Sequence, residues 1–350
     1  MNQIEILQGD ALEKLKEIPD ESVYCIVTSP PYFGLRDYSV CDCSLLDAPK
    51  ANCPLCGGLG IIQEVKEKQI GLEETPEQYT QKLVNIFREA RRVLKSDGTF
   101  WLVIGDSYNG SGGAGGDYNK GGSREGQPKY PGRNISYLKP KDLIGIPWRV
   151  AFALQADGWY LRTEIIWDKI ATMPESVKDR PLRNHEYIFL FSKSQKYYFD
   201  IDSIREPYSE ETLKRYKYDM QRLISLTGKD KISKKSNERK KIAPHPLGRL
   251  PKTIWHISPE YNYRENHFAV FPEDIPEKCI KAGCPKGEVV LDPFAGSGTT
   301  GMVARKLGRK AILIELNPLY IKMIEERTMA NVSIDKWMEN DYVSTDNGRL

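Results

Sequence analysis

The sequence predicts an α/β fold built on a mostly parallel, doubly wound sheet. The apolar run Val23–Val27, a helix beginning near Thr75 and a second apolar run, Thr99–Ile104, form a strand–helix–strand unit. Such units are typical of parallel strands joined by a crossover helix. Glu288–Thr300 reads as strand, glycine loop and helix start. At 350 residues, the chain is long enough for one large domain with insertions.

Periodicity and capping residues predict the other elements. Thr75 is a favoured N-cap, Pro76 suits the first turn, and the helix is expected to end near Asp97-Gly98. Further strands are expected at 4–7, 160–167, 186–191 and 311–314, and further helices at 11–18, 142–156, 276–281, 298–307 and 318–329.

The strand Val23–Val27 is followed by Thr28-Ser29-Pro30-Pro31-Tyr32. Prolines lack N–H donors and push the preceding residue towards extended backbone, so the strand should stop in a stiff elbow. The elbow would leave the Ser29 hydroxyl and the carbonyls of Ser29 and Pro30 as acceptors, with Tyr32 as a flat face beside them. Such a cluster suits a planar amine, for example the exocyclic amino group of a nucleobase. Taken alone, these five residues favour the simpler interpretation, a proline-rich turn after a strand.

A second motif lies near the other end of the chain. Asp292-Pro-Phe-Ala-Gly-Ser-Gly-Thr-Thr300 follows a strand, and its glycines let the backbone approach a ligand closely. The strand 311–314 ends at Glu315, 23 residues after Asp292. An acid at about this spacing is placed to bind ribose hydroxyls. The sequence has neither the P-loop Gly-Lys-Ser/Thr nor a full dinucleotide fingerprint, so it does not predict a phosphate cradle.

Together the two motifs resemble those of the amino-methylating (N4-cytosine/N6-adenine) DNA methyltransferases. That family has a Ser/Asn/Asp-Pro-Pro-Tyr/Phe/Trp catalytic motif and a cofactor loop similar to Asp292–Gly298. The catalytic motif comes first here, as in the β group of the family, and the resemblance covers about residues 4–330. It implies a Rossmann-like S-adenosylmethionine-dependent methyltransferase fold with circularly permuted motif order. The catalytic residues that it implies are Ser29, Pro30, Pro31 and Tyr32.

The resemblance also implies a set of cofactor-binding residues. They are Asp10, Phe271, Pro272, Asp292, Phe294, Ala295, Gly296, Ser297, Gly298, Thr299, Thr300, Glu315 and Asn317. An acid at the Asp10 position faces the adenine in the family, although Asp is also a favoured helix N-cap and both roles can hold. Residues around Arg183 and His185 would lie near the target base, although a lone histidine is more often structural.

Four cysteines lie within sixteen residues: Cys41, Cys43, Cys53 and Cys56. Their thiolates could hold one tetrahedral, structural Zn²⁺, because a four-cysteine site leaves no open position for catalysis. The alternative is four thiols in a loop. The chain has no signal peptide and no long apolar run, so we expect a soluble, cytoplasmic protein in which cysteines bind metal more often than they form disulfides.

Residues 203–256 carry 14 Lys/Arg against 6 Asp/Glu, whereas the whole chain has a net charge of only +3. In the family this region carries target recognition, and cations there would neutralise DNA phosphates. The expected DNA-binding residues are Lys234, Lys235, Arg239, Lys240 and Lys241. A solvated charge run is the alternative.

The expected division is a catalytic half at 1–202, the recognition region at 203–256, a cofactor-binding half at 257–334 and a tail at 335–350. The catalytic half includes a Cys-rich insert at 39–60 and a Gly-rich loop at 105–135, which is either a surface loop or a flap that orders on DNA. Expected partners are double-stranded DNA and a cognate restriction endonuclease, with the protein a monomer or homodimer and not membrane-bound.

Serine at the first position of the catalytic motif favours cytosine N4 as the methylated atom, and adenine N6 is the alternative. Cytosine C5 chemistry would need a nucleophilic cysteine, usually after proline, and no cysteine here follows a proline. An RNA or protein-amide methyltransferase and an inactive zinc-containing DNA-binding protein are the more distant alternatives.

Overall fold

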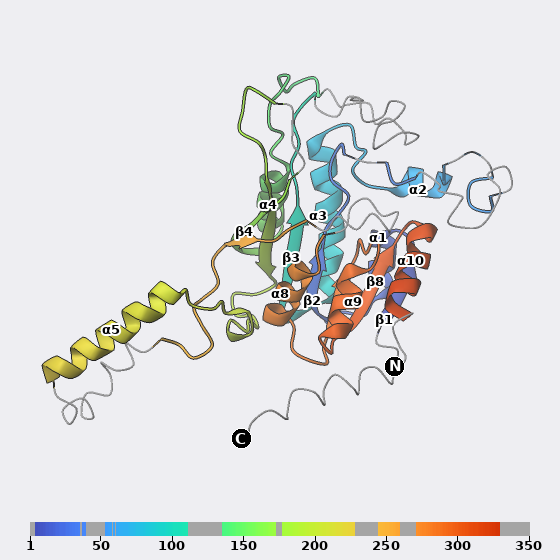
Figure 1. Cartoon of the computed structure of the whole chain (residues 1–350). Helices are drawn as coiled ribbons and strands as arrows, with labels where there is room; N and C mark the ends of the chain where they lie inside the picture. The colour runs from blue at the N-terminus through green and yellow to red at the C-terminus, as the bar shows by residue number, and fades with distance from the viewer. Residues whose placement is uncertain are drawn as a thin grey trace.

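The computed structural model describes residues 4–35, 37–39, 53–57, 59, 61–110, 135–172, 177–227, 244–259 and 271–329 (Figure 1). The strands are β1 (Ile4–Gln8), β2 (Val23–Thr28), β3 (Leu94–Ile104), β4 (Tyr160–Asp168), β5 (His185–Ser192), β6 (Ile254–His256), β7 (Val289–Asp292) and β8 (Lys310–Glu315). The α-helices are α1 (Ala11–Glu17), α2 (Gln63–Lys68), α3 (Pro76–Val93), α4 (Ile146–Ala156), α5 (Glu210–Thr227), α8 (Asp274–Gly283), α9 (Thr299–Lys306) and α10 (Pro318–Met329). Among these described helices, none is long and apolar enough to cross a membrane.

All eight strands form one sheet in the order β1-β8-β7-β2-β3-β5-β4-β6. Along the sheet, β1, β8, β7, β2 and β3 run parallel to one another. Strand β5 is antiparallel to β3 and β4, and β6 is parallel to β4. The mostly parallel sheet is therefore confirmed. Because parallel strands end at the same edge, the carboxyl ends of β1, β8, β7 and β2 meet there, and the antiparallel β5 begins there.

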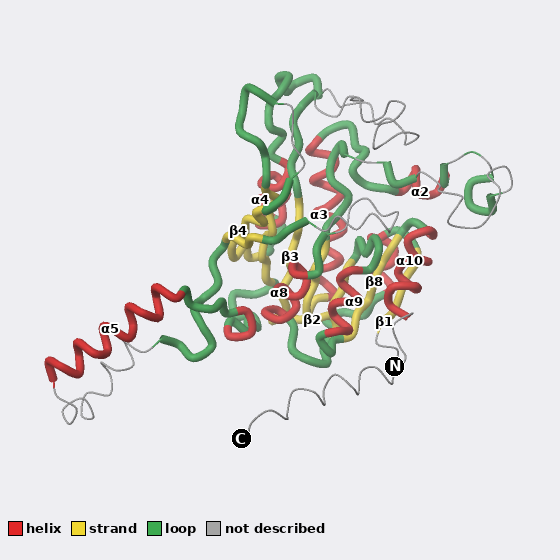
Figure 2. The backbone as a smooth tube through the Cα atoms, in the orientation of Figure 1, coloured by secondary structure: helices red, strands yellow, loops and turns green. Residues whose placement is uncertain are grey.

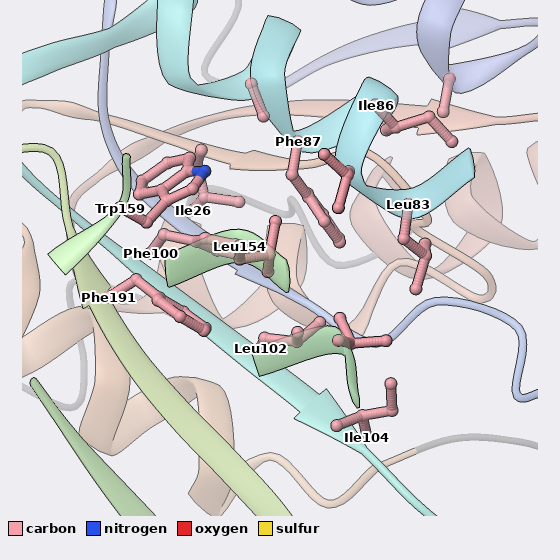
Figure 3. Packing of buried hydrophobic residues seen from close by; sticks show 14 of the residues in the cluster. Ile26, Leu83, Ile86, Phe87, Phe100, Leu102, Ile104, Leu154, Trp159 and Phe191 are labelled. Carbon is pink, nitrogen blue, oxygen red and sulfur yellow. The ribbon is translucent and has the colours of Figure 1, made fainter. Parts of the chain in front are cut away.

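Alternation along the strands divides the core into two layers. Phe100, Leu102 and Ile104 of β3 pack in one cluster with α1, α3 and α4, whereas Trp101 and Val103 pack in a second cluster with α8 and α9. This is the two-residue period of a strand buried on both faces. Figure 3 shows the first layer, in which the fully buried Phe100 ring stacks on Phe191 at 5.4 Å between ring centroids.

Two helix boundaries differ from the sequence expectation. The helix expected to reach Asp97-Gly98 ends at Val93, because Leu94 is already extended and pairs with Val23 of β2. The helix expected from residue 142 begins only at Ile146. Its start is set by Asp106, whose carboxylate accepts the backbone N–H groups of Gly145 and Ile146. Both boundaries depend on partners distant in the sequence.

The described parts of the expected recognition region, residues 203–227 and 244–256, form regular structure that its charge did not suggest. The region contains α5, an 18-residue helix that extends away from the sheet (Figure 2), and it ends in β6, which adds a strand beside β4. Trp255 of β6 is buried in the second core layer. The end of this region therefore belongs to the folded body of the protein.

Candidate active site

The elbow lies at the carboxyl end of β2 and is held from two sides. Tyr79 of α3 donates its hydroxyl to the carbonyl of Pro31 at 2.8 Å. Gly34 donates its N–H to the carbonyl of Gly71 at 2.8 Å, and a Cβ on Gly71 would lie 2.9 Å from the carbonyl oxygen of Tyr32. The elbow is thus a braced turn, in which the carbonyl of Pro31 is used by the protein itself.

Tyr32 reaches across the site edge to β5. Its hydroxyl donates to Glu186 Oε2 at 2.6 Å, and Lys169, just after β4, donates to Glu186 Oε1 at 2.5 Å. The ring lies against Gly105 at the end of β3, where a Cβ would be 2.6 Å from a ring carbon. Burial, and then the Glu186 carboxylate, raises the pKa of Tyr32 well above its ordinary value. Tyr32 is therefore a neutral hydroxyl donor.

Asp292 joins the elbow strand to the glycine loop. Thr28 donates its hydroxyl to Oδ1 at 2.6 Å and Thr300 donates to Oδ2 at 2.7 Å. The N–H of Phe294 adds a bond to Oδ1 at 3.0 Å. The side chain is buried, which raises its pKa to about 6 against the lowering effect of the hydroxyl hydrogen bonds. This carboxylate acts as a clamp between β2 and α9.

Glu315 organises the next part of the same edge. Its carboxylate accepts the N–H of Gly296 at 2.9 Å and the N–H of Asn317 at 2.8 Å. Gly296 has φ of +54°, a left-handed conformation that favours glycine. Burial raises the pKa of Glu315 to about 7, opposed by these two backbone donors. Glu315 thereby fixes both the glycine loop and the start of α10.

A pocket opens beside Glu315 at this edge of the sheet. Carboxylates of Asp10 and Glu315 lie in its wall together with the apolar Phe294 and Ile70, and Pro31 of the elbow closes one side. Its lining resembles that of small-molecule sites, which are mostly apolar with a few placed polar groups. An adenosine group fits this chemistry, because acids can accept from its amino and hydroxyl groups while apolar side chains cover its ring.

Nine of the thirteen predicted cofactor residues fall into two groups. Asp10, Phe294 and Glu315 line the pocket, and Asp10 also caps α1 by accepting the N–H of Glu13 at 3.1 Å, so both proposed roles of Asp10 are compatible. The second group lies beneath the loop with at most 7% exposure: Asp292, Ala295, Ser297, Thr299, Thr300 and Asn317. Phe271 packs against the second core layer.

Other predicted residues lie elsewhere or outside the described residues. His185 begins β5, and Arg183 lies near Asp106, with 3.8 Å between Nη1 and Oδ2. Cys53 and Cys56 are buried in a turn that packs against Leu319 of α10. Outside the described residues fall Cys41, Cys43, Lys234, Lys235, Arg239, Lys240 and Lys241. Among the residues that are described, no group of three or more metal-ligating side chains is present.

Several site residues were not expected from the sequence. Lys68, Gln69 and Ile70 at the end of α2, together with Tyr38, line this pocket. Four residues that brace the elbow were also missed, namely Tyr79, Gly105, Lys169 and Glu186. The one signal available was position, because Gly105 and Glu186 adjoin strand ends that neighbour β2 in the sheet.

Comparison with known proteins agrees with this geometry. The family model described as DNA methylase, of N6/N4 type, matches residues 23–326. The type II methyltransferase M.SmaI of Serratia marcescens is 42% identical over 94% of this chain and 92% of its own length. M.Cfr9I of Citrobacter freundii is 40% identical over 93% of this chain and 88% of its own. The chain belongs to the N6/N4 DNA methylase family. It is therefore an S-adenosylmethionine-dependent DNA methyltransferase.

Solved structures share the fold of this methyltransferase. The cytosine-N4-specific PvuII DNA methyltransferase aligns with a TM-score of 0.59 at 20% identity, covering 97% of this chain and 91% of that chain. A protein of Thermus thermophilus, solved with S-adenosyl-L-methionine, aligns with a TM-score of 0.52 at 22% identity, covering 94% of each chain.

Cofactor affinity should depend on the ionisation of Glu315. Burial disfavours its ionised form, and we expect that form to accept the ribose hydroxyls, so affinity for S-adenosylmethionine should rise as pH increases through about 7. Below that value it should fall by about tenfold per pH unit. Calorimetry across pH measures this. Glu315→Gln should bind the cofactor weakly. The remaining pH dependence of its affinity should come from Asp292, near pH 6. The exposed Glu325→Gln control should follow wild type, and an equally steep profile in Glu315→Gln would contradict the assignment.

Proposed function

We propose that this methyltransferase modifies the exocyclic amino group of a base in double-stranded DNA, with cytosine N4 as the target atom. The observation that carries the proposal is the shared wall between elbow and cofactor pocket. Pro31 lines the same pocket as Glu315, and the Thr28–Asp292 hydrogen bond joins the two motifs. A base amine at Ser29 would therefore lie beside the reactive end of the cofactor.

The elbow contributes orientation and electrostatics to the reaction. S-adenosylmethionine, when bound, supplies an electrophilic methyl group. The lone pair of the amine is delocalised into the base, so the protein must align it and favour a more tetrahedral nitrogen. In this proposal Ser29 Oγ and the carbonyl of Pro30 accept its two N–H groups and stabilise the positive charge that develops there. The base must leave the duplex to reach them.

Cytosine N4 is favoured over adenine N6 by Ser29 at the first position of the motif, and the PvuII enzyme, whose name specifies cytosine N4, shares the fold. Digestion of methylated DNA to nucleosides followed by mass spectrometry reads the modified base directly. N4-methylcytosine supports the proposal, and N6-methyladenine overturns the choice of base. The relatives are named type II methyltransferases, so we also propose a cognate restriction endonuclease that cuts the same DNA site.

Substitutions in the elbow should slow methyl transfer without loss of cofactor binding. Ser29→Ala removes an acceptor from the amine. Tyr32→Ala removes the stacking surface, which by analogy with single-strand binders is worth about 1–3 kcal/mol per base. Tritium transfer from labelled cofactor to duplex DNA under single-turnover conditions measures the rate. If both variants transfer methyl at the wild-type rate, the elbow is only a structural turn.

One structural Zn²⁺ is the second part of the proposal. Cys53 and Cys56 are 2% and 5% exposed, and the turn between them is closed by the N–H of Gly57, which donates to the carbonyl of Cys53. Two soft donors in one turn next to α10 support the proposal, because a tetrahedral thiolate site needs such a pair for half of its ligands. Cys41 and Cys43 would supply the other half.

Purified protein should therefore carry about one zinc ion per chain. Elemental analysis should find zinc in wild type and in Cys279→Ser, a buried cysteine of α8 in the second core layer. The pair Cys53→Ser/Cys56→Ser should lose it. Zinc near zero in all three proteins would mean that the cluster is made of ordinary thiols.

DNA recognition by residues 203–256 is the third part. Exposed cations of α5, including Lys214, Lys217 and Arg222, extend the charge of this region along a helix that stands away from the sheet. Such a projecting basic element is suited to track a phosphate backbone.

Neutralising Lys234, Lys235, Lys240 and Lys241 to glutamine should weaken DNA binding and flatten its salt dependence. The slope of log affinity against log salt should fall by about 0.9 for each lysine that contacts a phosphate. Fluorescence anisotropy across a salt series measures the slope.

The matched control is Lys286→Gln with Lys310→Gln, two exposed lysines beside the starts of β7 and β8, opposite the site edge. An unchanged slope in the four-lysine variant would place recognition elsewhere.

A further inference from the structure

Four polar side chains form one continuous hydrogen-bonded chain across the site edge. Ser29 Oγ lies 3.4 Å from the hydroxyl of Tyr32, Tyr32 lies 2.6 Å from Glu186, and Glu186 lies 2.5 Å from Lys169. The chain starts at the elbow after β2, crosses to the start of β5 and ends after β4. Its first contact is long, as hydrogen bonds in catalytic sites often are before substrate binds.

The chemistry of its far end fixes the direction of every hydrogen bond. A lysine ammonium only donates and a carboxylate only accepts. Tyr32 must therefore donate its single proton to Glu186, which leaves the phenol oxygen to accept. The hydroxyl of Ser29, 3.4 Å away, can then donate to that oxygen.

The consequence concerns the lone pairs of Ser29. A serine hydroxyl can donate one hydrogen bond and accept two. If the hydroxyl proton of Ser29 pointed at the substrate, it would face the N–H groups of a base amine, and two donors repel each other. With its proton directed to Tyr32, both lone pairs are available to the amine.

We propose that Glu186 and Lys169 are positioning residues that, through the hydroxyl of Tyr32, hold Ser29 in the orientation of a hydrogen-bond acceptor for the target amine. The inference rests on the proposed role of Ser29. No proton is transferred along the chain, and no bond is made or broken in it. Glu186 and Lys169 act through Tyr32 and Ser29 rather than on the substrate.

The surroundings keep the chain in place. The Lys169 ammonium lies 4.7 Å from the centroid of the Trp167 ring, and the indole N–H of Trp167 donates to the carbonyl of Ile257 at 2.9 Å. Glu186 and Lys169 keep only 17% and 23% of their side-chain surface exposed. A charged pair that is shielded from solvent in this way orients its neighbour more strongly than a solvent-exposed pair does.

A purely structural ion pair is the competing interpretation. Strands β4 and β5 are already paired from Tyr160↔Ser192 to Asp168↔His185, so the two strands do not depend on Glu186–Lys169 to stay together. The two interpretations differ in one measurable respect. A structural pair acts independently of the Tyr32 hydroxyl, whereas an orienting chain acts only through it.

The test is a double-mutant cycle of Tyr32→Phe and Glu186→Gln. Tyr32→Phe keeps the aromatic ring and removes the hydroxyl. In Glu186→Gln, Lys169 takes the amide oxygen and the NH₂ faces Tyr32, which turns the phenol proton towards Ser29. Each single variant should slow single-turnover methyl transfer by about 10- to 100-fold, the range for a lost charge-assisted hydrogen bond. The double variant should be no slower than the slower single variant.

Affinities for cofactor and DNA should stay within about twofold of wild type in every variant, because the predicted loss falls on the rate of transfer. Glu288→Gln is the matched control. Glu288 forms a half-exposed pair with Lys95 at 2.8 Å near the opposite edge of the sheet, and its loss should leave the rate unchanged. If Glu186→Gln does not fold, Lys169→Met takes its place in the cycle.

The outcomes separate this inference from the proposed function. If the rate loss in the double variant equals the product of the two single losses, the pair acts independently of Tyr32. That result would show a structural ion pair and overturn the inference. Wild-type rates in Tyr32→Phe and Glu186→Gln, with a slow Ser29→Ala, would also overturn it while leaving the elbow catalytic. Wild-type rates in both Ser29→Ala and Tyr32→Ala would instead overturn the catalytic role of the elbow in the proposed function.

Discussion

The site depends on the hydrogen bonds that Thr28 and Thr300 donate to the buried carboxylate of Asp292. The ladder between β2 and β7 is short, with Cys25 paired to Val290 and Ile26 to Leu291. Beyond it the elbow and the glycine loop diverge, and the clamp fixes their spacing. Burying a carboxylate is costly unless it is well hydrogen-bonded, and Asp292 meets that condition with three donors.

This clamp explains why the motif order along the chain does not matter for the site. Thr28 and Asp292 are 264 residues apart in sequence but belong to neighbouring parallel strands that end at the same edge. In a doubly wound sheet, ligands bind at the carboxyl ends of the strands. A chain that begins at β1 or at β7 would place the elbow beside the same pocket.

Local chemistry made part of this arrangement predictable. The effects of two prolines on a strand and of glycines on a loop are local, because they do not depend on residues far along the chain. The elbow and the glycine loop could therefore be found from the sequence. Tyr79 and Glu186 could not, because each acts on an elbow residue far along the chain. The start of α4 was misplaced for the same reason, since Asp106, 40 residues before Ile146, supplies the acceptor for its first N–H groups.

The site edge is built mainly from acceptors. Asp10 and Glu315 line the pocket beside the glycine loop, and in our proposal Ser29, directed by Tyr32 and Glu186, accepts from the amine. The groups to be bound are donors: the amino and hydroxyl groups of adenosine and the N–H groups of the base. Because carboxylates and directed hydroxyls are held by the protein before substrate arrives, little reorganisation is needed during transfer. The same acceptors would repel a phosphate, which agrees with a glycine loop that lacks a phosphate-binding lysine.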